Sequence, residues 1–151
     1  MTAAKDKVDP RLLKGPEALF KTSPKAEAEG VELDYGDFWI KVTRAGATNA
    51  RFKRLFDKAM KPHRRAVAND TMNNDVAERI TREVWAESIV LGWGSKLGDG
   101  LMPYQGEALP FNVPNCIRLF DELPDLFIDV REQSMKLGLF QDDEQETDTG
   151  N

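Results

Sequence analysis

The chain has 151 residues and a mass of 17.0 kDa, which favours a single domain. With 40% hydrophobic and 31% charged residues it has the composition of a globular protein, not of a fibrous or wholly disordered one. No apolar run approaches the roughly 18 residues of a transmembrane helix, and residues 1–14 do not resemble a secretory signal. We therefore expect no membrane association and a cytoplasmic location.

The net charge of −5 is unevenly distributed along the chain. Residues 141–151 hold five acidic residues and no basic one, so residues 1–140 carry 21 of each sign. An acidic stretch without aromatic residues cannot bury apolar surface, and we predict that 141–151 is a disordered tail. In contrast, 41–65 holds nine basic residues and a single acid, Asp57, which indicates a surface for an anionic partner.

Residues 1–30 are interrupted by proline and lack a long periodic segment. We predict a flexible arm that docks on the domain through Leu19 and Phe20. Residues 31–43 alternate with period two on both sides of Gly36 and Asp37, which predicts a β-hairpin.

Beyond the hairpin the hydrophobic period becomes helical. The spacing predicts an amphipathic helix over 49–61, ended or kinked by Pro62, with a further turn over 63–68. A longer helix is expected to start at an asparagine cap, Asn73 or Asn74, and to extend to Leu91.

The second half begins with a segment rich in glycine and proline, 92–110, for which we predict an irregular loop packed on the domain. Asn112 is expected to cap the next helix, with Pro114 in its first turn. A last helix is predicted from Pro124 to Gly138. The expected fold is α+β and mainly α-helical: an N-terminal hairpin followed by about four helices over 31–140, between disordered termini.

Residues that could carry enzyme chemistry are few. One cysteine and one histidine exclude an internal disulfide and the usual zinc sites. Cys116 falls on the apolar face of a predicted helix and His63 within a basic run, so we expect neither to be catalytic. The pairs of acidic residues that are neighbours in the sequence fall on predicted surfaces, so we expect them to be hydrated and not catalytic. We predict a protein without catalytic activity, cofactor or metal.

Several short sequence motifs follow one another in an order that resembles the tail assembly chaperones of long-tailed bacteriophages. The second half has AESIVLGW at 86–93, a glycine-rich segment, LPFNVPN at 109–115 and LPDL at 123–126. The first half has WIKV at 39–42 and KAMKPHRR at 58–65, which is similar to a basic helix that ends in a Lys-Pro-aromatic-Arg-Arg element.

The resemblance covers about 31–140 and implies a non-catalytic protein of the host cytoplasm. Such a chaperone binds the helical tape measure protein and keeps it soluble while tail tube protein assembles around it. Self-association into an oligomer, and a longer form made by translational frameshifting, are further implications.

Aromatic and methionine side chains are enriched in interfaces, and helices with wide apolar stripes can form a groove for a partner helix. The candidates for such a partner-binding surface are Trp85, Trp93, Met102, Tyr104 and Phe120, for each of which core packing is the alternative. The candidate anion contacts are Arg51, Lys53, Arg54, Lys58, Arg64 and Arg65. Two other functions remain open: a structural virion subunit of the tail or head, and a nucleic-acid-binding protein that uses 41–65, which the low pI disfavours.

Overall fold

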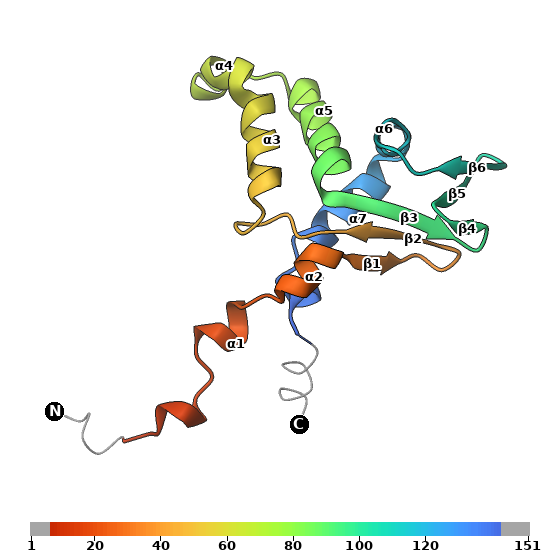
Figure 1. Ribbon diagram of the computed structural model, residues 1–151. Coiled ribbons are helices and arrows are strands. Elements are labelled where there is room, and N and C mark those ends of the chain that lie inside the picture. The colour runs from red at the N-terminus through yellow and green to blue at the C-terminus, as the bar shows by residue number, and fades with distance from the viewer. Residues whose placement is uncertain (1–6, 143–151) are drawn as a thin grey trace.

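The computed structural model describes residues 7–142 (Figure 1). Its helices are η1 (Pro10–Leu12), α1 (Pro16–Phe20), α2 (Pro24–Glu29), α3 (Ala50–Met60), η2 (Lys61–His63), α4 (Arg64–Ala68), α5 (Asn74–Val84), η3 (Trp85–Ile89), α6 (Val113–Glu122), α7 (Pro124–Ser134) and η4 (Leu137–Phe140). Its strands are β1 (Val31–Asp34), β2 (Phe38–Val42), β3 (Val90–Ser95), β4 (Gly98–Asp99), β5 (Leu101–Tyr104) and β6 (Glu107–Pro110).

An antiparallel sheet of order β1-β2-β3-β4 forms the centre of the domain, and β5 and β6 make a separate hairpin. The predicted hairpin is confirmed as β1 and β2, with Leu33 opposite Ile40. Its turn needs Gly36, whose φ is +92°, and Asp34 Oδ1 accepts a hydrogen bond from the Gly36 N–H at 2.8 Å.

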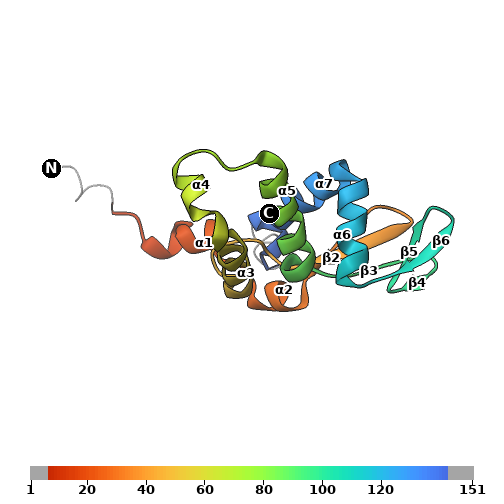
Figure 2. The ribbon, with the colours of Figure 1, turned by 90° about the horizontal axis from the view of Figure 1, so that it is seen from above.

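Helices α6 and α7 lie together along one side of the sheet, and α3 and α5 rise from one end of it (Figures 1 and 2). The fully buried side chains come from both layers, as expected for an α+β domain. They include Ile40 and Val42 from the sheet, Leu119 and Phe120 from α6, and Val130 from α7. Aromatic rings link the layers: Trp85 meets Phe52 of α3 at 4.9 Å and Phe127 of α7 at 6.2 Å between ring centroids.

Three predicted helix starts are confirmed in atomic detail. Asn49, Asn73 and Asn112 each accept hydrogen bonds from backbone N–H groups of the first turn of α3, α5 and α6. The kink at Pro62 is also confirmed, since η2 and the short helix α4 follow α3 directly. Local hydrogen bonding is sufficient to place these elements.

The prediction of an irregular loop over 92–110 is wrong. Strand β3 begins at Val90 and pairs with β2 along its length, so the helix predicted to reach Leu91 ends in the π-helical turn η3. The glycines of this segment lie in strands and turns and do not interrupt the structure. In the turn between β5 and β6, for example, Gly106 has a positive φ of +79°, next to Gln105 at +52°.

The last predicted helix is also too long. Helix α7 ends at Ser134, where the last turn tightens: the N–H groups of Met135 and Lys136 donate to the carbonyls three residues back, Glu132 and Gln133. Gly138 therefore lies inside η4 and not at a helix C-terminus.

Residues 7–30 differ from the predicted arm, because they contain η1, α1 and α2. Leu19 and Phe20 do not dock on the domain, since 59% and 69% of their surfaces are exposed. The backbone of this segment is attached instead: the Leu19 carbonyl accepts from Gln141 Nε2 at 3.0 Å, and the Ser23 N–H donates to the Phe140 carbonyl at 2.6 Å. Apart from Gln141 and Asp142, the predicted acidic tail lies outside the described residues, as do residues 1–6.

Candidate binding surfaces

The five residues predicted to form a partner-binding surface lie mostly in the core. Trp85, Trp93, Met102 and Phe120 are at most 5% exposed, so the prediction of a surface formed by them is wrong. Trp93 illustrates the reason: β3 is a central strand, and the indole N–H donates to the Leu109 carbonyl at 3.1 Å. Only Tyr104 is partly exposed, with Arg118 over its ring at 5.5 Å.

An apolar groove of about 260 Å³ lies between α5 and α7. Its lining residues are Ala77, Glu78, Thr81, Arg82, Pro124, Phe127, Ile128 and Arg131. Ile128 is 42% exposed, and Arg131 stacks over the Phe127 ring at 5.7 Å. An apolar floor between charged rims suits the apolar face of an amphipathic helix.

The sequence itself contains a signal for this groove. Phe127 and Val130 lie on the buried face of α7, and Ile128 lies outside that face. A large apolar residue on the polar face of a helix has no core to enter, so it stays at the surface.

The segment before α2 carries a second set of exposed apolar residues. Leu12, Leu13, Leu19 and Phe20 are between 59% and 79% exposed. They lie in η1, directly after it and in α1, and this part of the chain extends away from the rest of the described residues (Figure 1). Gln141 tethers the end of this segment by donating from Nε2 to the Leu19 carbonyl at 3.0 Å.

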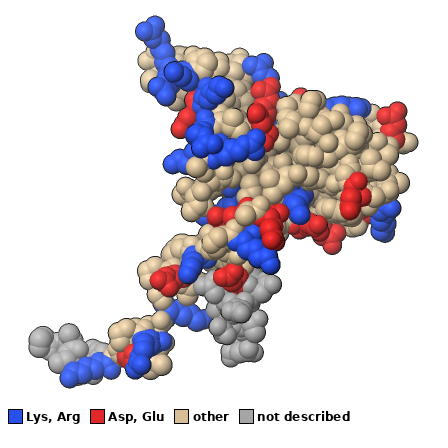
Figure 3. Space-filling model, viewed as in Figure 1, with Lys and Arg blue, Asp and Glu red and all other residues tan. Residues whose placement is uncertain are grey.

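Seven of the nine basic residues of 41–65 lie on α3, η2 and α4, whereas Lys41 lies in β2 and Arg44 pairs with Glu27. We call the basic face the seven exposed side chains Arg51, Lys53, Arg54, Lys58, Lys61, Arg64 and Arg65. They cover the projecting unit made by α3, η2 and α4 (Figure 3). Within residues 7–142, no carboxylate forms an ion pair with any of the seven.

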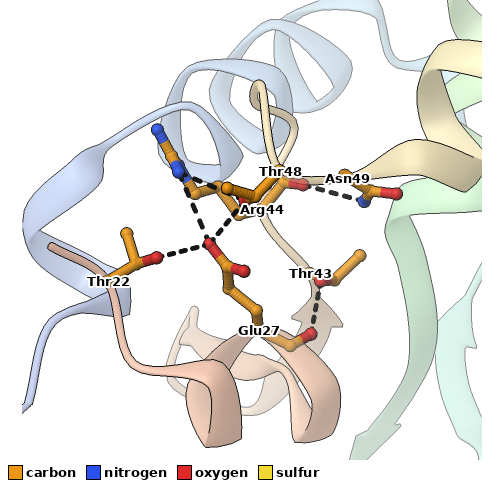
Figure 4. A network of polar contacts seen from close by, with 6 residues as sticks. All are labelled: Thr22, Glu27, Thr43, Arg44, Thr48 and Asn49. Carbon is orange, nitrogen blue, oxygen red and sulfur yellow. Dashed lines mark hydrogen bonds and ion pairs between the residues drawn. The ribbon is translucent and has the colours of Figure 1, made fainter.

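A polar network joins α2 to the loop before α3 (Figure 4). Glu27 Oε1 accepts hydrogen bonds from Thr22 Oγ1 at 2.8 Å and Thr48 Oγ1 at 2.9 Å, and pairs with Arg44 Nη1 at 3.4 Å. The Glu27 carbonyl accepts the Thr43 hydroxyl at 2.5 Å. The network borders a cavity of about 380 Å³ and holds α2 against the loop between β2 and α3.

The cysteine and the histidine lie on different elements. Cys116 is 1% exposed on α6, and burial raises the pKa of its thiol to about 12, so the thiol stays protonated at neutral pH. His63 lies in η2 at the far end of α3. Among residues 7–142, no three His, Cys, Asp or Glu side chains cluster in a way that could hold a metal ion.

The described chain is thus a small α+β domain with an apolar groove and a separate cationic surface. The profile of the YdaY prophage protein family matches residues 47–151, more than two thirds of the chain. The protein therefore belongs to the YdaY prophage protein family and is of phage origin. No curated protein and no solved structure matches it significantly. No helix within 7–142 is both long enough and apolar enough to cross a membrane.

Proposed function

We propose that this prophage protein is a tail assembly chaperone that acts in the host cytoplasm, without catalysis. It binds the tape measure protein and keeps it soluble while tail tube protein assembles around it. The order and spacing of the segments between 39 and 126 support this role, and membership of a prophage family agrees with it.

The observation that carries the proposal is the groove between α5 and α7. A tape measure protein is long and helical, and an apolar groove binds such helices through side chains spaced by three and four residues. Phe127 provides the floor and Ile128 an exposed apolar rim. Arg131, which has no carboxylate partner among residues 7–142, flanks the groove and can pair with an acidic residue beside the apolar stripe of a helix.

Co-expression with the tape measure protein of the same prophage tests the proposal. The wild-type chain is expected to bring the tape measure protein into the soluble fraction and to co-purify with it. Ile128→Asp places an unpaired charge in the groove and should lower the yield of complex about tenfold or more. Leu97→Asp is the matched control, because Leu97 is a 55% exposed apolar residue outside the groove.

Absence of a complex with the wild-type chain, across several tape measure fragments, would reject the proposal. Equal loss with both variants would reject the groove as the binding surface. Mass spectrometry of purified particles tests the alternative of a structural virion subunit, which remains in the particle whereas a chaperone does not.

A further inference from the structure

The arginines of the described chain fall into two groups. Outside the basic face, each is paired: Arg11, Arg44, Arg79, Arg82 and Arg118 pair with carboxylates, and Arg131 stacks on the Phe127 ring. On the basic face, Arg51, Arg54, Arg64 and Arg65 have no carboxylate or ring partner among residues 7–142. The fold therefore leaves the arginines of one surface unpaired.

The basic face also has a high density of positive charge. Between residues 50 and 68 there are seven basic side chains and one acid, Asp57. All seven are exposed on helices that project from the sheet (Figures 1 and 3). Guanidinium groups bind carboxylates and phosphates through two parallel hydrogen bonds, so the chemistry of the face is that of an anion-binding surface.

The chain contains a segment of complementary charge. Residues 142–151 hold five acids (Asp142, Asp143, Glu144, Glu146 and Asp148) and no base. This segment carries the whole net charge of −5, because residues 1–140 have 21 residues of each sign, so the chain itself supplies an acidic polypeptide partner for the basic face.

The acidic segment leaves the described chain at Asp142, far from the basic face (Figure 1). The described chain ends beside α2, where Phe140 is tethered to Ser23 and Asp142 lies near Lys25. Helix α4 lies at the far end of α3, away from α2 (Figure 1). Complementary surfaces at opposite ends produce head-to-tail contacts between copies.

We infer that the basic face of one copy binds the acidic segment 142–151 of a second copy, which produces head-to-tail association of the protein. The contact is electrostatic and exposed, so it weakens as salt screens the charges. This inference is independent of the proposed function, because it requires neither a tape measure protein nor the groove between α5 and α7.

Two complementary variants test the inference. In the reversed-face variant, Lys58, Arg64 and Arg65 are replaced by Glu. In the neutral-segment variant, the three aspartates and two glutamates of 142–151 become Asn and Gln. The control reverses three exposed lysines of the N-terminal region, Lys7, Lys14 and Lys21, and so has the same change in net charge as the reversed-face variant.

Light scattering after size-exclusion chromatography gives the mass of each sample. The wild type and the control should exceed 17.0 kDa at low salt and return to 17.0 kDa in about 1 M salt, where the Debye length is about 3 Å. Each variant alone should remain a monomer at the same concentration, because its self-association should be at least about tenfold weaker than that of the wild type. An equimolar mixture should form a dimer and nothing larger, because only one complementary pair of surfaces remains.

Three results would overturn the inference. The first is a wild-type chain that is monomeric at low salt. The second is a wild type that associates while the mixture of variants does not, which places the contact between copies on another surface. The third is a mass increase that disappears with nuclease treatment, which assigns the basic face to nucleic acid.

Discussion

The indole Nε1–H of Trp85 donates a hydrogen bond to Ser134 Oγ at 2.9 Å, in the interior of the domain. Ser134 has no exposed surface, and its hydroxyl in turn donates to the Arg131 carbonyl at 2.8 Å. Its own carbonyl accepts the Ala45 N–H. One serine therefore joins the π-helical turn η3, the end of α7 and the loop after β2.

Ser134→Ala should destabilise the protein by about 1–3 kcal/mol, because it leaves the buried indole N–H of Trp85 without an acceptor. Urea denaturation measures the loss. Ser88→Ala is the control: Ser88 is also buried, but its hydroxyl only donates to the Val84 carbonyl, and its loss should cost about 1 kcal/mol or less. Equal losses would show that the Trp85 contact contributes nothing specific.

Gly94→Ala should destabilise the sheet. Gly94 lies opposite Trp39, and a Cβ atom at Gly94 would lie within 2.6 Å of two ring atoms of that side chain. The ring must move, at a cost of about 1–3 kcal/mol. Gly92→Ala in the same strand is the control, because a Cβ there meets no atom within 4 Å. Thermal unfolding of both variants should show a lower midpoint for Gly94→Ala alone.

Glu27→Ala should loosen α2 from the loop before α3. The change removes the carboxylate that accepts hydrogen bonds from Thr22 and Thr48 and pairs with Arg44. We therefore expect the free energy of unfolding to fall by about 1–3 kcal/mol. Limited proteolysis with trypsin should show faster cleavage after Lys25. Glu29→Ala, at an exposed position of the same helix, should leave the cleavage rate unchanged.

The stability of the protein should fall as the pH rises above about 9, partly because of Cys116. Burial raises the pKa of this thiol to about 12 in the folded protein, against about 9 when exposed. Between these values the unfolded state binds fewer protons, so stability decreases with pH. Urea denaturation at several pH values between about 8 and about 11 gives the free energy of unfolding as a function of pH. Cys116→Ala should make the decrease of that free energy with pH less steep. An unchanged slope would contradict the assignment.

The same burial predicts slow chemical labelling. A thiol reagent should react with native Cys116 much more slowly than with the unfolded chain, since the thiolate is the reactive form. Ellman's reagent, with and without denaturant, measures both rates. Rapid labelling under native conditions would show that α6 opens often enough to expose its core face.

The elements that the sequence alone determined are those whose hydrogen bonds are local. The β1–β2 hairpin closes over three residues around Gly36, and the asparagine caps act within one helical turn. The exposed basic residues of 50–68 also follow from sequence, because a charge-rich helix face is hydrated wherever the helix lies.

Only the tertiary structure decided which large apolar residues face water. Trp93 is buried because β3 pairs with β2, about fifty residues away in the chain, and no local pattern specifies that partner. Ile128 lines a groove only because α5 and α7, which are distant in the chain, lie next to each other. The composition of the core and of the groove therefore depends on contacts between distant segments, whereas helix starts and tight turns depend on near neighbours.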